Sequence, residues 1–180
     1  MWVTVIESVD EAIASLARLF DEGMSEAEPA WLTEARGRWA EPAPAIGLSV
    51  VVPIWRDPWM VVGSGTYADD LLRRIGIDNR YGDPGAGGDA VGPDRVRPGG
   101  GERRYPRVTL DEIVASRPDV VVLPDEPYPF SSTDGPEAVA PIPAALVSGR
   151  ALTWYGPAMV TAAAELLPSV LAASAGDGRP

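Results

Sequence analysis

The residues best suited to binding chemistry form a short aromatic and cationic cluster, Trp55-Arg56-Asp57-Pro58-Trp59, which Met60 follows directly. Two indoles around a guanidinium could form the wall of a binding site for a flat ligand with polar edges. Arg56 would then face a carboxylate or phosphate of that ligand. The same residues are also typical of a loop that packs on itself, with the arginine stacked on tryptophan. The residue types leave both interpretations open.

A second candidate is the pair of carboxylates Asp125 and Glu126. Adjacent carboxylates can perform acid/base catalysis or hold Mg²⁺. No nucleophile or second base accompanies them in the sequence, so a loop capped by acidic groups is the simpler interpretation.

The segment from Gly63 to Ala68, GSGTYA, matches the G-x-G-x-x-A pattern of dinucleotide-binding turns. That chemistry also needs an acidic residue at a strand end, whereas Asp83 falls in a Gly-rich stretch. A plain tight turn is favoured, and a small nucleotide-binding α/β enzyme is the alternative function.

Composition excludes several classes of chemistry. The chain of 180 residues contains no cysteine and no histidine, and all 15 basic residues are arginine. Disulfides, thiol nucleophiles, structural zinc sites, imidazole bases and Schiff-base lysines are therefore excluded. A metal held by this chain would be a hard cation on oxygen ligands. Against 26 acidic residues the net charge is −11, which argues against nucleic acid as a partner.

The elements that must position these residues alternate between strands and helices. Alternation of this kind predicts an α/β fold, a three-layer Rossmann-like lobe with a mostly parallel sheet, preceded by a helical connector. Functional residues are then expected beyond the carboxyl ends of the strands, in loops 54–60, 124–130 and 148–157. Strands are predicted at 2–6, 48–53, 59–62, 119–123 and 144–147. Helices are predicted from Ser8 to Gly23, from the capping signal Ser25 and Glu28 to Trp39, and at 66–75, 109–116 and 157–173, the last bent at Pro168.

Four segments in order resemble the helical-backbone metal receptors, the substrate-binding proteins of ABC transporters for cobalamin and ferric siderophores. The segments are PIWRDPWMVVG (53–63), RYPRVTLDEI (104–113), PDVVVLPDEPY (118–128), and VSGR (147–150) leading to WYGP (154–157). The resemblance covers residues 48–172.

The resemblance implies two α/β lobes joined by a rigid helix, with the ligand between them. Residues 1–41 then correspond to the end of a missing first lobe and the connecting helices, and residues 42–180 to the C-terminal ligand-binding lobe, with 82–104 as a flexible loop. The connector departs from the family pattern at Gly23 and Pro29, where that helix usually continues.

The resemblance also implies roles for individual residues. Asp111 matches an acidic residue that docks to a permease arginine, and Glu112 lies beside it, although both also suit the start of a helix. The implied ligand contacts are Trp55, Arg56, Trp59, Met60, Tyr105, Trp154 and Tyr155.

The function expected from this resemblance is non-enzymatic. The chain would be the substrate-binding component, or a truncated lobe of it, of an ABC transporter for cobalamin, a ferric siderophore or a similar metal chelate. The chelate would be held by aromatic stacking and Arg56, without a cofactor and without direct metal ligation. A further alternative is a non-binding remnant that dimerises through an unpaired strand at residues 1–6. The family is extracytoplasmic, whereas the chain as written carries no signal peptide and would stay in the cytoplasm.

Overall fold

The computed structural model describes residues 4–82 and 103–176 of the chain. Its main sheet has four strands in the order β4-β1-β5-β6, and every neighbouring pair is parallel. The strands are β1 (Leu48–Val51), β4 (Ile77–Asn79), β5 (Val120–Pro124) and β6 (Ala144–Val147). The predicted α/β class and parallel sheet are therefore confirmed.

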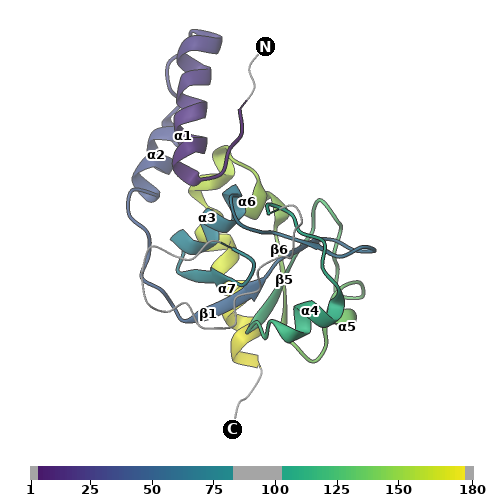
Figure 1. Cartoon of the computed structure of the whole chain (residues 1–180). Helices are drawn as coiled ribbons and strands as arrows, with labels where there is room; N and C mark the ends of the chain where they lie inside the picture. Colours follow the sequence, from purple (N-terminus) through teal and green to yellow (C-terminus); the bar gives the residue numbers. More distant parts are fainter. Residues whose placement is uncertain (1–3, 83–102, 177–180) are drawn as a thin grey trace.

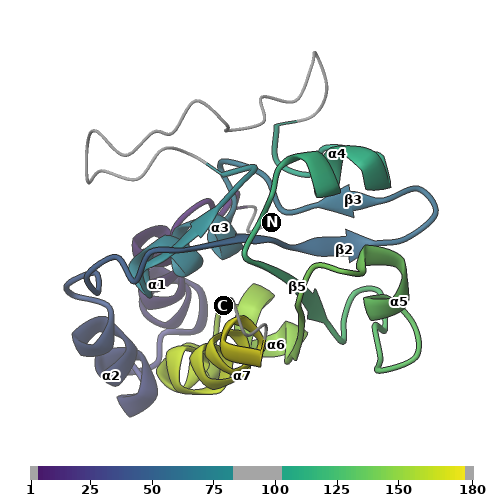
Figure 2. The same cartoon turned by 90° about the horizontal axis from the view of Figure 1, so that it is seen from below.

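Helices cover both faces of the sheet, because its central strands are apolar on both sides. Val50 and Val122 face one core, whereas Val51 and Val121 face a second core on the other side. Figure 2 shows the three layers, with α4 on one side of β5 and α6 and α7 on the other. The first core is covered by α3 (Tyr67–Arg74), α6 (Gly149–Thr153) and α7 (Ala162–Gly176), and the second by α4 (Leu110–Ala115) and α5 (Pro136–Val139).

Three helices begin where the sequence predicts, two of them, at Ser8 and Thr109, after a predicted capping residue. The hydroxyl of Ser8 accepts a hydrogen bond from the backbone N–H of Glu11, and Thr66 caps α3 in the same way. At the start of α4, Thr109 and Glu112 form a complete capping box, in which each side chain bonds the other residue's backbone N–H. These caps fix where each helix leaves the preceding loop.

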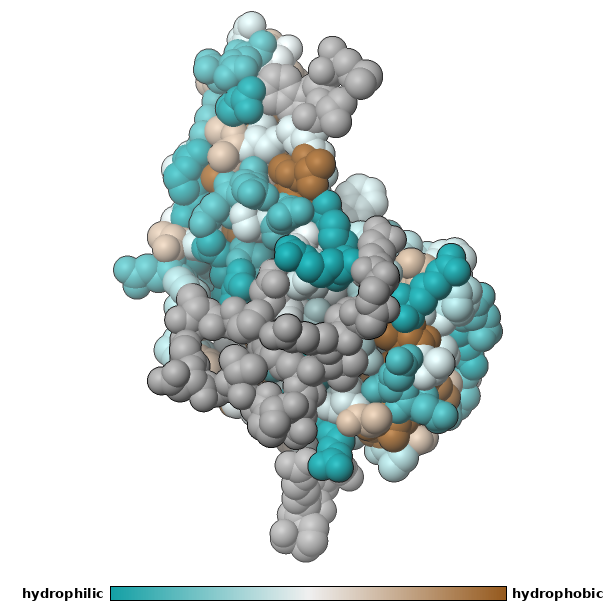
Figure 3. Space-filling view, viewed as in Figure 1, coloured by the Kyte–Doolittle hydropathy of each residue, from teal (hydrophilic) through white to brown (hydrophobic). Residues whose placement is uncertain are grey.

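An N-terminal helical arm projects from the α/β lobe, as Figure 1 shows. It consists of α1 (Val9–Arg18), a π-helical turn (Leu19–Met24) and α2 (Ala30–Arg38). The rings of Phe20 and Trp31 meet edge to face, with centroids 6.3 Å apart, and hold the two helices together. The visible face of this arm is mostly hydrophilic (Figure 3).

Two buried contacts fasten this arm to the lobe. The carboxylate of Asp70 on α3 accepts a hydrogen bond from the backbone N–H of Val9 at 2.8 Å and pairs with Arg73 and Arg74. The indole N–H of Trp39 donates to the carbonyl oxygen of Met159 at 2.8 Å.

Several expected elements are corrected by the structure. Residues 4–6 belong to no strand among the described residues, and Ser25 caps no helix because it has a left-handed backbone and α2 begins after Pro29. Trp55, expected in a loop, ends a strand of the antiparallel hairpin β2 (Pro53–Trp55) and β3 (Met60–Val61). The elements β4, α5 and α6 were not predicted. Most of the predicted loop 82–104 lies outside the described residues.

Candidate ligand-binding site

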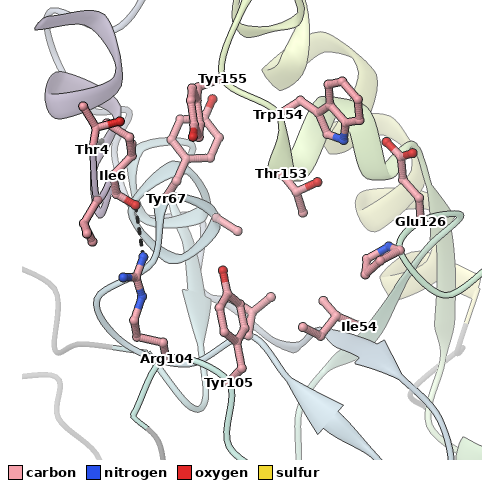
Figure 4. A pocket seen from close by; sticks show the side chains of 14 residues that line it. Thr4, Ile6, Ile54, Tyr67, Arg104, Tyr105, Glu126, Thr153, Trp154 and Tyr155 are labelled. Carbon is pink, nitrogen blue, oxygen red and sulfur yellow. Dashed lines mark hydrogen bonds between the residues drawn. The ribbon is translucent and has the colours of Figure 1, made fainter. Parts of the chain in front are cut away.

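A cleft of about 570 Å³ lies beyond the carboxyl ends of the parallel strands (Figure 4). Each of the three predicted edge loops contributes to it, through Ile54, through Glu126 and Pro127, and through residues 153–155. The remaining walls come from residues 4–6, from the start of α3, and from Arg104 and Tyr105. The volume is typical of sites for small molecules and cofactors.

Aromatic side chains form much of the cleft wall. The rings of Tyr67 and Tyr155 meet edge to face, with centroids 5.8 Å apart. Trp154, which ends α6, is 57% exposed, and Tyr155 is 45% exposed. Tyr105 rises from the wall below them in Figure 4. Large exposed rings in a concave site offer flat apolar surface to a ligand.

Three cleft residues carry buried polar atoms without a partner. Among residues 4–82 and 103–176, no hydrogen bond satisfies the hydroxyl of Tyr67, the Nε of Arg104 or the Oε1 of Glu126. Buried polar atoms in folded proteins are usually satisfied, so three unsatisfied atoms in the residues around one cleft are unusual.

The side chain of Tyr67 is held as a neutral phenol. Burial raises the pKa of its hydroxyl above the ordinary value, and the nearby charge of Asp70 raises it further. Tyr67 is 5% exposed, and its hydroxyl stays protonated at neutral pH.

Arg104 is positioned by the N-terminal segment. Its Nη2 donates to the carbonyl oxygen of Ile6 at 3.2 Å, and its Nη1 lies 3.7 Å from the carboxylate of Glu7. These contacts leave the Nε free of a partner among the described residues.

The carboxylates of Asp125 and Glu126 do not act as a pair. The Oδ1 of Asp125 accepts a hydrogen bond from the backbone N–H of Gly149 at 2.7 Å, whereas Glu126 lines the cleft. Gly149 permits this close approach, because a Cβ there would lie 2.5 Å from the Cγ of Glu126. No group of three or more acidic residues in the described part of the chain is placed to hold a metal ion.

The cluster at Trp55, Arg56, Trp59 and Met60 is not among the residues that line this cleft. Side chains alternate along a strand, so Ile54 faces the cleft and its neighbour Trp55 does not. Trp55 meets Tyr128 edge to face at 5.7 Å instead.

The guanidinium of Arg56 is engaged by the chain's own acidic groups. It pairs with Asp134, lies 2.6 Å from the Oε1 of Glu137, and sits 5.6 Å from the centre of the Trp59 ring. The hydrogen bond from Arg56 lowers the pKa of Glu137 below its usual range. None of the four residues lines this cleft, so the predicted contact of this cluster with a ligand, which stays a prediction, would need a different surface.

The Gly63 to Ala68 turn is filled by protein. A Cβ on Gly63 would lie 2.2 Å from the carbonyl oxygen of Arg103, and one on Gly65 would lie 2.8 Å from its guanidinium. The N–H of Gly63 donates to the carbonyl oxygen of Arg104 at 2.7 Å. A dinucleotide phosphate needs this space and these N–H groups, so the geometry favours the tight turn.

The two residues assigned to permease docking lie on the first turn of α4, and both are exposed. Glu112 is engaged in the capping box, whose hydrogen bond from the Thr109 backbone lowers the pKa of its carboxyl. Asp111 remains on the surface, and its docking role stays a prediction.

Of the predicted ligand contacts, the structure brings Tyr105, Trp154 and Tyr155 together in the cleft. The sequence analysis did not assign Tyr67, Arg104 or Glu126 to a ligand site. Tyr67 was considered only as part of the glycine motif, and Glu126 only as part of the carboxylate pair. Arg104 was considered only as part of a segment that carries the family resemblance. One sequence signal could have identified Glu126 as a cleft residue, because it lies directly after a buried strand.

Comparison with solved structures supports the fold. The vitamin B12 binding protein BtuF of Vibrio cholerae is 14% identical with a TM-score of 0.58, and the match covers 93% of this chain and 63% of that one. The heme-binding protein RhuT from Roseiflexus sp. RS-1 is 16% identical with a TM-score of 0.65, covering 93% and 65%. CeuE of Helicobacter pylori, solved with Ni-His, is 13% identical with a TM-score of 0.61, covering 96% and 55%.

The chain therefore has the fold of the helical-backbone metal receptors, as the sequence predicts. It spans less than two thirds of the length of these three structures. BtuF and RhuT are periplasmic binding proteins. No protein-family model and no curated protein matches this sequence. In the described part of the chain, no helix is both long and apolar enough to cross a bilayer.

Proposed function

We propose that this chain is the substrate-binding component of an ABC transporter, or a lobe of one, and that it binds a metal chelate in the cleft. The chelate would be a corrinoid, a heme or a ferric siderophore. Tyr105, Trp154 and Tyr155 would contact its flat surface, and Asp111 would dock to a permease. This function places the chain outside the cytoplasm.

One observation carries the proposal: a cleft lined by aromatic side chains lies where α/β folds bind ligands. The fold agrees with it, because binding proteins for vitamin B12 and heme share that fold. The chain contains no histidine or cysteine, so a direct bond to the metal would need an oxygen ligand such as a tyrosine hydroxyl.

The experiment is equilibrium dialysis of the purified chain against cyanocobalamin, haemin and ferrichrome, read by their visible absorbance. We expect at least one to bind with a Kd on the order of 0.1 mM or tighter, which corresponds to a binding free energy of about −5.5 kcal/mol or below. This modest affinity reflects a cleft whose rings stay exposed on one side.

A matched pair of tryptophan variants locates the site. Trp154→Ala removes an exposed indole from the cleft wall and should weaken binding about tenfold. Trp55→Ala removes a similarly exposed indole that does not line the cleft, so it should change the Kd less than twofold. The proposal fails if no probe binds, or if both variants weaken binding equally.

A further inference from the structure

The exposed indole of Trp154 is held in place by a residue of its own helix. Trp154 directly follows α6, and its side chain is 57% exposed. The guanidinium carbon of Arg150 lies over this indole, 5.7 Å from the centre of the ring, a distance at which the cation and the ring attract each other. The backbone N–H of Trp154 also donates to the carbonyl oxygen of Arg150 at 3.1 Å. Arg150 therefore contacts both the main chain and the side chain of Trp154.

The start of α6 is fastened to the loop that follows β5. The Oδ1 of Asp125 accepts a hydrogen bond from the backbone N–H of Gly149 at 2.7 Å, and a bond of this kind is strengthened by the charge of the carboxylate. In the middle of the helix, Ala151 and Leu152 are buried in the core. Helix α6 is thus fixed at its start by Asp125 and along its length by packing.

Neither Asp125 nor Arg150 lines the cleft, whereas Trp154 and Tyr155 do. Figure 4 shows Trp154 across the cleft from Tyr105, so its ring belongs to one wall of the site. An exposed side chain loses conformational entropy when a ligand immobilises it, and this loss is smaller where the side chain is already held. Contacts that hold Trp154 before a ligand arrives therefore favour binding.

We infer that Arg150 and Asp125 are positioning residues of the cleft. Asp125 fixes the start of α6, and Arg150 covers one face of the Trp154 ring at the end of that helix and leaves the other face for the ligand. This inference rests on the proposed function and deepens it, because it assigns residues that act on binding without touching the ligand.

The test is a double-mutant cycle of the full chain, read by equilibrium dialysis. The probe is whichever of cyanocobalamin, haemin and ferrichrome binds the wild type most tightly. Arg150→Ala should weaken binding about threefold, because the stacked cation is lost. In the Trp154→Ala background the same change should alter the Kd less than about 1.5-fold, because the ring through which Arg150 acts is absent. Arg38→Ala is the control, since it removes the same charge from an exposed position on α2 and should leave the Kd unchanged in both backgrounds.

A matched pair of variants tests Asp125. Asp125→Ala removes the acceptor at the start of α6 and should weaken binding about threefold. Asp125→Asn keeps an oxygen that can accept from Gly149 and should lose less affinity than Asp125→Ala. Equal losses in the two variants would show that the hydrogen bond does not position the helix.

A second readout needs no ligand. In protein labelled with 5-fluorotryptophan, the ¹⁹F resonance of Trp154 is identified by its loss in Trp154→Ala. Arg150→Ala and Asp125→Ala should shift this resonance and leave the other tryptophan resonances in place, whereas Arg38→Ala should shift none.

Two outcomes overturn the inference and leave the proposed function standing. The first is an Arg150→Ala change that weakens binding equally with and without the Trp154 ring, which means that Arg150 acts on the ligand itself. The second is a Trp154 resonance that neither Arg150→Ala nor Asp125→Ala moves. If no probe binds the wild type, the proposed function fails, while a shifted resonance still shows that Arg150 and Asp125 position the ring.

Discussion

The attachment of the helical arm depends on one buried carboxylate, that of Asp70. Its side chain is 8% exposed, and it contacts the backbone N–H of Val9, the Nε of Arg74 at 3.0 Å and the guanidinium of Arg73. We predict that Asp70→Asn destabilises the protein strongly, although asparagine has nearly the same shape. The reason is that the change removes the carboxylate that Arg73 and Arg74 share and leaves Arg74 with only the exposed Asp10.

The expected magnitude follows from the burial of these groups. The Arg74 side chain is only 14% exposed, so water cannot replace the lost carboxylate there. Removing one partner from a buried ion pair costs about 3–5 kcal/mol, and the retained amide oxygen can still accept from Val9. We therefore expect a loss of about 3 kcal/mol. Asp10 is the matched control, because it also pairs with Arg74 but its side chain is 72% exposed. Asp10→Asn should cost less than about 0.5 kcal/mol.

The assay is equilibrium urea unfolding at neutral pH, monitored by circular dichroism and tryptophan fluorescence. Hydrogen exchange at the first turn of α1 then shows whether the arm loosens before the lobe. If Asp70→Asn costs no more than Asp10→Asn, the arm is not held by this carboxylate and the reasoning is refuted.

The pH dependence of unfolding provides an independent check on Asp70. Burial alone would raise the pKa of this carboxyl, but the hydrogen bond from Val9 and the two arginines lower it below the ordinary value. A carboxyl with a lowered pKa in the folded state contributes stability that is fully present above its unfolded pKa, about 4. That contribution is lost as the pH falls through the lowered folded value. The wild type should therefore lose more stability below pH 4 than Asp70→Asn does.

Three further predictions concern packing and capping, each measured as a change in the free energy of urea unfolding. Trp39→Phe should cost about 1–3 kcal/mol, because it leaves the carbonyl of Met159 unpaired, and a loss below about 0.5 kcal/mol would contradict this. Gly63→Ala should cost more than about 2 kcal/mol, because the new Cβ would overlap a carbonyl oxygen. Gly37→Ala is the control: its Cβ meets nothing within 4 Å, so it should stabilise α2 by about 0.5–1 kcal/mol. Thr109→Ala removes the capping box of α4 and should cost about 1 kcal/mol, with Thr109→Ser retaining most of it.

The sequence predicts the layers of this fold well because its strongest signals are local. The apolar runs at Val50 and Val121 require burial on both faces, and the caps at Ser8, Thr66 and Thr109 fix three helix starts. Short elements such as β4 and α6 were not predicted, because three to five residues are too few to show a clear periodicity.

The site was predicted in part for a related reason. The rule about strand ends locates the correct edge of the sheet and the loop that carries Trp154 and Tyr155, whereas Tyr105 was expected there only from the family resemblance. It does not say which side of a loop faces that cleft. Ile54 and Trp55 are adjacent in sequence and face different surroundings, which depends on the register of the β2–β3 hairpin. The acidic partners of Arg56 arrive from residues 134 and 137, far along the chain.

Helix α3 joins two features that have been described separately. Tyr67 on its first turn lines the cleft, and Asp70, three residues later, grips the start of α1. A helix of eight residues is only about 12 Å long and behaves as a rigid rod. A tilt of this helix at the cleft would also move the carboxylate of Asp70 that bonds the start of α1. A ligand that shifted α3 would therefore also move the contact between Asp70 and the start of the arm.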